Sequence, residues 1–279
     1  MKAFHEQRTY HSGLLFSAWT PKNIQFLAHW HEELELICVL EGELRMGINS
    51  EMRLLQAGEM AVCSSGDIHY YDSENLASKA LIVCFHPQMI GFPGGWPSGV
   101  GFRSPFIGSA EIGHSEIEKA KLFDLLALMY RMYFEWTEQQ SGYEMVIKGL
   151  VYELCGLLLR TNPTEIADAK RDKRRVINTG VMQKALEYIE DHYMNSISIE
   201  DTANYCNMSM FHFSRFFKMG AGIGFNTYLN SYRIQQAEHL IVTSDLSMLD
   251  ISIECGFNNV RTFNRVFKQI KKCRPTDLR

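Results

Sequence analysis

The sequence lacks the cysteine pairs that mark disulfide frameworks and zinc fingers. Its seven cysteines are scattered along 279 residues, and none forms a Cys-x-x-Cys pair. It also lacks any run of about 18 consecutive apolar residues, the length that a membrane span needs, and residues 1–10 lack the apolar core of a signal peptide. We therefore expect reduced thiols, no membrane contact and a cytoplasmic location.

The chain as a whole also lacks the excess of positive charge that would indicate a nucleic-acid-binding protein, since its net charge is −4. The charge is uneven, however. Residues 1–169 carry 12 Lys and Arg against 21 Asp and Glu, residues 170–175 carry five against one, and residues 176–279 carry 11 against 10. An acidic half joined through a basic segment to a nearly neutral half indicates two functions, and the length fits about two domains.

Proline is absent between Pro163 and Pro275, where apolar residues recur with a helical period, so the C-terminal part is predicted to be all-α. The N-terminal part differs. Residues 10–87 contain short β-rich runs, such as Leu34–Leu40 and Leu44–Ile48, separated by turn signals such as Glu41-Gly42. This pattern predicts a β-barrel or sandwich. Residues 91–109, rich in Gly and Pro, are predicted to form a loop.

Between these two parts the apolar period is helical from about Ser115, breaks at Ser141-Gly142 and ends at Asn162-Pro163, which predicts a helical hairpin. The predicted fold class is therefore α+β and multidomain, with an N-terminal β-barrel, the hairpin and an all-α C-terminal part. The expected bounds are 1–110 for the barrel, 111–163 for the hairpin, 164–179 for a linker that contains the basic segment, and 180–279 for the helical part.

The hairpin carries more apolar residues than one helical pair packed on a barrel obviously needs. Its two apolar stripes are Leu122/Leu126/Met129 and Val146/Leu150/Leu154/Leu157. We expect some of these side chains to lie in the core and the hairpin to join two copies of the chain as a homodimer.

The C-terminal part contains an internal repeat. Phe211–Lys218 aligns with Arg261–Lys268 at an offset of 50, whereas Cys206 aligns with Cys255 at an offset of 49, so the second copy has one more residue in its turn. Each copy reads as a short helix, a turn and a longer helix, which is a helix-turn-helix. Asn207 and Gly256 fall in the turns, where a positive φ is easily tolerated.

The longer helix of each copy has an inner and an outer face. Phe213, Phe217, Phe263 and Phe267 are one helical turn apart in pairs and are predicted to pack inward. Arg and Asn can bond base edges, Lys suits phosphate, and an aromatic or aliphatic group can touch a thymine methyl. A solvated helix face is the alternative, but the repetition of Arg and Lys favours DNA contact. The candidate DNA-binding residues are Phe211, Ser214, Arg215 and Lys218 in the first copy and Val260, Arg261, Asn264, Arg265 and Lys268 in the second.

From Gly180 to Arg279 the chain resembles the DNA-binding domain of AraC-type transcription regulators, in which a long helix, here Phe225–Thr243, joins two helix-turn-helix units. Residues 209–218, 251–257 and 262–268 carry the resemblance. Two positions depart from the family pattern: Lys272 stands where a glycine is usual, and Leu278 where an aromatic residue is usual. These departures concern the last turn. The resemblance implies that the C-terminal part binds double-stranded promoter DNA.

A second motif lies in the barrel. His29, His31, Glu35 and Gly42 fit the first cupin motif, His-x-His-x3-Glu-x6-Gly, and Gly58, Gly66 and His69 fit much of the second, in which Ser64 replaces a usual proline and Ser73 a usual asparagine. The segment therefore resembles a cupin domain. Strand alternation places His29, His31 and Glu35 on one face, where His69 from a neighbouring strand can join them.

Three uses of this cluster stay open: a site for Fe, Mn, Ni or Zn, hydrogen bonds to a polar ligand, or a structural role. We expect no resident cofactor and a ligand site made of His29, Trp30, His31, Glu35 and His69.

The sequence thus favours a ligand-responsive transcription regulator over an enzyme. The alternative is a metal-dependent cupin enzyme that carries a DNA-binding domain. The small-molecule effector is expected to be a sugar or another small metabolite, because the family resemblance favours carbohydrate and because Trp19, Trp30, Trp96 and Tyr70 offer aromatic surface that can stack on sugar rings. No Ser-His-Asp arrangement, P-loop or dinucleotide fingerprint accompanies the cluster.

Overall fold

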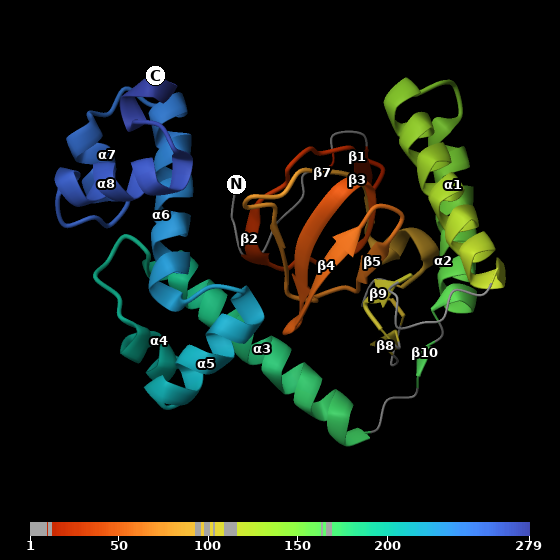
Figure 1. Ribbon diagram of the computed structural model, residues 1–279, viewed down its shortest axis with the longest axis horizontal. Helices are drawn as coiled ribbons and strands as arrows, with labels where there is room; N and C mark the ends of the chain where they lie inside the picture. Colours follow the sequence, from red (N-terminus) through yellow and green to blue (C-terminus); the bar gives the residue numbers. More distant parts are fainter. Residues whose placement is uncertain are drawn as a thin grey trace.

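A computed structural model describes residues 10, 13–92, 96–97, 101–102, 104–108, 116–162, 164–165 and 169–279. The β-rich unit lies in the middle, with a helical hairpin on one side and the C-terminal helices on the other (Figure 1). The predicted fold class is confirmed: a β-rich unit with helices is followed by an all-helical part. Among the described residues, no helix combines the length and the apolar character that crossing a membrane requires.

The barrel is built around one long strand. Strand β3 (Leu34–Ile48) pairs with β7 (Ser78–Phe85) and β5 (Met60–Cys63) through its first half and with β4 (Glu51–Gln56) and β6 (His69–Asp72) through its second half. The sheet is completed by β1 (Phe16–Trp19) against β7, β2 (Phe26–His29) against β6, and β9 (Phe106–Ile107) against β5, all antiparallel. One strand therefore belongs to both faces of the barrel.

The turn that the sequence predicts at Glu41-Gly42 is wrong. Strand β3 is continuous there, with a shift in its register against β7 between Val39 and Glu41. Gly42 adopts a φ of +71°, and a Cβ on it would overlap the carbonyl of Ala77. A glycine in this conformation bends a strand without ending it, which is how a β-bulge lets β3 pass from one face to the other.

The predicted loop over residues 91–109 also contains short strands. Besides β9, β8 (Gly101–Phe102) pairs with β10 (Thr164–Glu165), and a 3-10 helix (Pro87–Ile90) precedes them. These strands have two residues each, too few to produce the alternation that identifies a strand in a sequence.

The helical hairpin is confirmed. Helix α1 (Glu116–Glu138) and helix α2 (Tyr143–Thr161) pack against each other, and both contribute to the largest hydrophobic core. This core joins Leu125, Met129 and Leu154 of the hairpin to Leu36 and Val83 of the barrel. The hairpin is therefore part of the N-terminal unit.

Helix α3 (Ala169–His192) runs through the segment predicted to be a linker. The basic residues 170–175 lie in its first turns, although their side chains are outside the part that the structure describes, and the boundary expected at residue 180 falls inside the helix. The remaining helices are α4 (Ile199–Tyr205), α5 (Met210–Ala221), α6 (Phe225–Thr243), α7 (Met248–Glu254), α8 (Val260–Lys271) and a final 3-10 helix (Pro275–Leu278).

Candidate functional site

Helices α4 and α5 form the first helix-turn-helix unit. Ser198 caps α4 through a reciprocal pair of hydrogen bonds with Asp201, which satisfies the free amides at the helix start. The turn Cys206–Ser209 follows, with Asn207 at a φ of +56°. Phe213 and Phe217 of α5 are fully buried, as predicted, so the opposite side of this helix faces solvent.

Helices α7 and α8 form the second unit in the same way. Its turn, Cys255–Asn259, is one residue longer, and Gly256 has a φ of +76°. A Cβ on Gly256 would overlap the carbonyl oxygen of Tyr193, so this turn needs a glycine for its space as well as its conformation. Asn259 caps α8 by accepting a hydrogen bond of 2.8 Å from the Thr262 amide, and Phe263 and Phe267 are fully buried.

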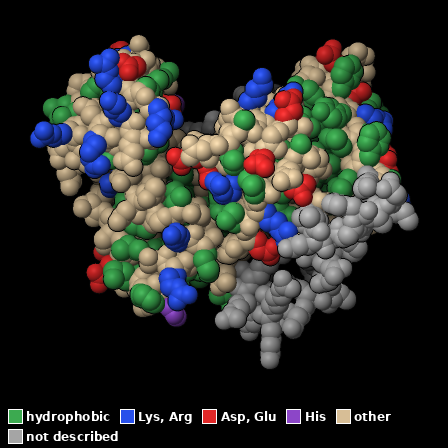
Figure 2. All heavy atoms as spheres, viewed as in Figure 1, with side chains coloured by type: hydrophobic (Ala, Val, Ile, Leu, Met, Phe, Trp, Pro, Cys, Tyr) green, Lys and Arg blue, Asp and Glu red, His purple; other side chains and the backbone are tan. Residues whose placement is uncertain are grey.

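The outer faces of α5 and α8 carry the residues predicted to contact DNA. Eight of these nine residues are exposed, and Phe211 is exposed over 68% of its surface. Val260 differs because it is partly buried and packs against the core of the second unit. Lys and Arg side chains gather over the second unit, at the upper left of Figure 2.

The departure from the family pattern at Lys272 leaves the local geometry intact. Lys272 ends α8 in the left-handed conformation with a φ of +61°, and its amide donates to the carbonyl of Lys268. Gly222, at the corresponding position after α5, has a φ of +74°. Leu278, the second departure, packs against the core of the second unit.

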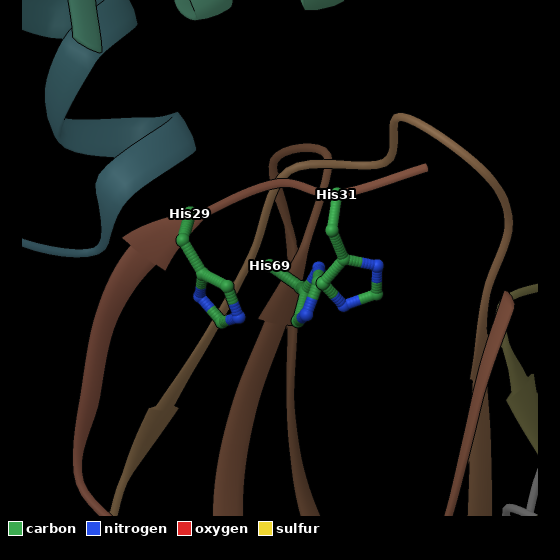
Figure 3. A group of neighbouring side chains, drawn as sticks. All are labelled: His29, His31 and His69. Carbon is green, nitrogen blue, oxygen red and sulfur yellow. The ribbon is translucent and has the colours of Figure 1, made fainter. Parts of the chain in front are cut away.

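The histidines of the cupin motif converge inside the barrel, as predicted. His29 ends β2, His31 follows it, and His69 begins β6, so that their three rings point toward one another (Figure 3). The ring centroids of His29 and His69 are 4.1 Å apart, and those of His31 and His69 are 4.9 Å apart. All three side chains are almost completely buried. This group, together with Glu35, is called the histidine pocket below.

Each of these histidines is oriented by a backbone carbonyl. The Nδ1 atoms lie 2.9 Å from the Leu27 oxygen for His29, 3.1 Å from the Glu33 oxygen for His31, and 2.9 Å from the Asp67 oxygen for His69. In a neutral ring, the nitrogen that faces a carbonyl carries the proton, and the other nitrogen keeps its lone pair. In this tautomer, Nε2 is the atom that can accept a hydrogen bond or bind a metal.

A buried carboxylate lies among these nitrogens. The two Glu35 oxygens lie 3.4 Å from His31 Nε2 and 3.5 Å from His69 Nε2, and Tyr71 donates a hydrogen bond to Glu35. Sequence reasoning missed Tyr71 and also Cys84, whose sulfur lies near His31 and Glu35. The alternation of β6, which places residues 69 and 71 on the same face, was the signal for Tyr71.

Burial determines the protonation of this pocket. Desolvation lowers the pKa of His29 well below its ordinary 6.5, and the neighbouring His69 and His31 lower it further. Desolvation likewise raises the pKa of the nearby Cys63 thiol well above its ordinary range, with the charge of Glu35 adding to the effect. His29 is thus neutral and Cys63 is protonated at neutral pH.

Trp30 does not line the histidine pocket, contrary to the prediction. It lies between His29 and His31 in the sequence, and alternation turns it to the other side, where it packs against the core of the first helix-turn-helix unit. Two other aromatics expected to stack on a sugar also pack elsewhere, since Trp96 is buried against Phe102 and Tyr70 belongs to the same core as Trp30. Only Trp19 lies against the barrel interior.

The apolar stripes predicted to join two copies also need correction. Met129, Leu150 and Leu154 are buried in the chain's own core, and Leu122, Leu126 and Leu157 pack against it. Their helical period identified the side of the hairpin that packs against the chain's own core. Among the described side chains of α1 and α2, the large apolar ones that are exposed are Phe123, Tyr130, Phe134, Met145, Val146, Tyr152 and Leu159.

Comparison with known proteins agrees with both halves of this architecture. Residues 17–85 match the cupin domain family, and residues 202–279 match a helix-turn-helix domain family. The chain is 23% identical over 285 aligned residues to the HTH-type transcriptional activator RhaS of Klebsiella pneumoniae (strain 342), an alignment that covers 100% of this chain and 97% of RhaS.

Two further proteins resemble the chain less completely. The regulatory protein PocR of Salmonella typhimurium is 32% identical over 127 residues, which are 46% of this chain and only 42% of PocR. The crystal structure of ToxT from Vibrio cholerae O395 aligns with 94% of this chain and 96% of its own at 10% identity, with a TM-score of 0.43. PocR is named as a regulatory protein and RhaS as a transcriptional activator, so neither name supports the alternative of a metal-dependent enzyme.

Proposed function

We propose that this chain, which belongs to the AraC-type transcription regulators and carries an N-terminal cupin domain, binds promoter DNA through both helix-turn-helix units and changes that binding when a small molecule enters the histidine pocket. The observation that carries the proposal is a set of three imidazoles and one carboxylate buried together inside the barrel. A polar ligand that hydrogen-bonds to these groups stabilises the arrangement of the chain to which it binds.

The chemistry of the pocket indicates the kind of effector. Three Nε2 lone pairs and a carboxylate offer acceptors, so the best ligand presents several donors, as the hydroxyl groups of a polyol do. Phe26, whose ring centroid lies 4.4 Å from that of His29, adds an aromatic wall. A carbohydrate or a similar polyhydroxylated metabolite is therefore the first class to test, consistent with genes of carbohydrate or small-metabolite use as the target.

A divalent transition metal is the second candidate, and the donor set fits it. Ligand atoms of His29, His31 and His69 lie within 4.8 Å of one another, and the Glu35 carboxylate is adjacent. The backbone carbonyls that hold the Nδ1 atoms orient the rings as outer partners do at metal sites. A metal bound there would supply positive charge to an effector's oxygen atoms, and the three histidines and Glu35 would hold it.

One experiment distinguishes these ligands. A thermal-shift screen of the full chain against sugars, polyols, Zn²⁺ and Ni²⁺ measures stabilisation by mass action, and the matched control is His31→Ala. We expect a polyol to raise the melting temperature of the wild type and not of the variant. If metal fills the pocket, chelation lowers the melting temperature of the wild type alone. Equal shifts in both proteins for every compound would exclude the pocket as the effector site.

We also propose a homodimer through the outer face of the hairpin. Phe123, Tyr130 and Phe134 recur on α1 at the spacing of a coiled-coil seam, and all three are exposed. Antiparallel pairing of two α1 helices across a two-fold axis places Asp124 of one copy toward Arg131 of the other, which complements their charges.

Light scattering tests this interface. The double variant Phe123→Glu/Phe134→Glu is expected to be a folded monomer, because two buried carboxylates per copy oppose pairing. Thr137→Glu, on the same helix but at a polar exposed position, is the control and stays dimeric. A dimeric double variant would place the interface elsewhere.

A further inference from the structure

The barrel and the first helix-turn-helix unit share one hydrophobic core. Ala28, Ile68 and Tyr70 of the barrel are buried together with Phe217 of α5 and Tyr228 of α6. Trp30 and Leu27 pack against this core from the barrel side. The second unit has its own core, which contains only residues from position 234 onward among those described. The first unit is therefore held by a core that it shares with the barrel, whereas the second unit is held by a core of its own.

Three specific contacts join the barrel to the helices around the first unit: α3, the end of α5, and α6. The hydroxyl group of Tyr228, which is fully buried, donates a hydrogen bond of 2.6 Å to the carbonyl oxygen of Ala28. The amide of Gln183 donates to the Gly66 carbonyl at 3.1 Å. The ring of Tyr70 lies on Gly222, so closely that a Cβ there would be 2.5 Å from the ring. We call these three contacts the clasp.

Each contact of the clasp is adjacent to one histidine of the pocket. Ala28 precedes His29 on β2, and Tyr70 follows His69 on β6. Gly66 is linked to the third histidine because its amide donates a 2.8 Å hydrogen bond to the His31 carbonyl. The backbone that orients the three rings is thus the same backbone that holds the first unit.

The clasp leaves the DNA-reading surface open. It contacts the corner between α5 and α6, at Gly222 and Tyr228, while Ser214, Arg215 and Lys218 on the outer face of α5 stay exposed. The barrel therefore does not cover the outer face of α5. It fixes the position of that face through its contacts with the corner between α5 and α6.

We infer that the histidine pocket regulates DNA binding through the clasp, by setting the position of the first helix-turn-helix unit while the second unit is left unchanged. The inference rests on the proposed function, in which the pocket receives the effector. A ligand that moves the three rings moves Ala28, Tyr70 and Gly66, and a packed interface responds by changing between discrete arrangements. Because both units must reach one DNA site together, a shift of one changes the affinity of the pair.

Hydrogen exchange measured by mass spectrometry on the full chain tests the coupling without any effector. The pocket variant is His31→Gln, which keeps the side-chain size, and the clasp variant is Tyr228→Phe, which removes only the hydroxyl group. Tyr188→Phe is the control, because Tyr188 stacks on His192 and Tyr205, outside the clasp.

Both test variants are expected to raise exchange about fivefold in peptides from 213–232, the effect of losing one buried hydrogen bond, and to leave peptides from 248–271 unchanged. The exchange rate of the double variant should be about that of each single variant, and not a further fivefold higher, because both substitutions act on one equilibrium. Exchange that rises only within the barrel in His31→Gln, or equally in both units, would overturn the inference.

The two proposals fail in different ways. If no compound stabilises the wild type but His31→Gln still raises exchange in the first unit, the proposed effector site fails. The coupling between the histidine pocket and the first unit is then still supported. If a ligand stabilises the wild type through His31 while exchange in the first unit follows neither the ligand nor the variants, the pocket binds its effector and the clasp does not transmit it.

Discussion

The two helix-turn-helix units have matching sequences and matching local folds but different surroundings. Helix α5, which is capped by Gly222, packs into a core shared with the barrel, whereas the described core around helix α8, which is capped by Lys272, contains only its own neighbours and α6. The same left-handed position illustrates the difference: Gly222 lies under the Tyr70 ring and has no room for a side chain, and the Lys272 position accepts one. Duplicated units therefore need not have duplicated roles.

This difference makes the first unit sensitive to the barrel and leaves the second unit independent of it. Removal of a buried phenylalanine from each unit tests this at the largest scale. Phe217→Ala and Phe267→Ala should each cost about 3–5 kcal/mol, because both side chains are fully buried. We expect Phe217→Ala to increase hydrogen exchange in β2 and β6 as well as in α5, and Phe267→Ala to increase it only in α7, α8 and the end of α6. Equal patterns would show that the units are not different.

The arginines on the two outer faces sharpen the comparison on DNA. Arg215→Ala and Arg265→Ala are each expected to weaken specific binding by about 1–3 kcal/mol without loss of fold, because each side chain can reach a base edge. Lys218→Ala and Lys268→Ala should instead weaken binding to all sequences and reduce its salt dependence. Fluorescence anisotropy against selected and scrambled duplexes measures both effects. Unchanged affinity in both arginine variants would reject the assignment of the outer faces.

A fall in pH should destabilise the part of the chain that contains His29 and leave the second helix-turn-helix unit unchanged. Since burial lowers the pKa of His29 in the folded chain below its ordinary 6.5, the unfolded chain takes up this proton first as the pH falls. The contribution of a neutral His29 is complete above pH 6.5 and declines below it by up to about 1.4 kcal/mol per pH unit, until the folded pKa is reached. Chemical denaturation between pH 7.5 and 5 should show this loss in the wild type and a smaller one in His29→Gln. None of the described residues buried in the second unit is a histidine, so this unit should keep its exchange protection.

The smallest expected effect lies at the ends of the two recognition helices. Lys272→Gly should stabilise the second unit by about 0.5–1 kcal/mol, because glycine adopts a positive φ more readily than lysine. At the matching position, Gly222→Ala should destabilise the first unit, because its new methyl group would overlap Tyr70. Thermal denaturation of both variants gives the signs, and Gly224→Ala, which has open space and a negative φ, is the near-neutral control.

Local patterns in the sequence predicted the parts of this fold that depend on neighbouring residues. The helical period located α1 and α2, the family resemblance supplied the helix Phe225–Thr243, and the offset between the two copies predicted the longer second turn. Alternation predicted that His29, His31 and Glu35 would share a face, and motif spacing added His69. Apart from the resemblance, each of these inferences required only a period or a spacing.

Features that depend on contacts between distant segments were not accessible in this way. Trp30 has the alternation of an outward residue, and nothing local indicates that a helix 200 residues later covers that side. The stripe containing Met129 and Leu154 looks the same whether it faces the barrel or a second copy. The Glu41-Gly42 turn was predicted because a bulge and a hairpin turn place glycine in similar conformations, and only the pairing of β3 with two sheets distinguishes them.

Helix α6 links the two units as a single uninterrupted element of 19 residues. At a rise of about 1.5 Å per residue it is roughly 28 Å long, shorter than the roughly 34–36 Å between successive major grooves on one side of a DNA duplex. The length of α6 fixes the distance between the two units, and its number of residues also fixes the angle between them around the helix axis. Inserting one residue in its middle would turn the second unit by about 100° around the helix axis and remove it from the side of the duplex that the first unit reads. If both units read one duplex, as proposed, the number of residues in α6 sets the spacing and the angle between the two half-sites.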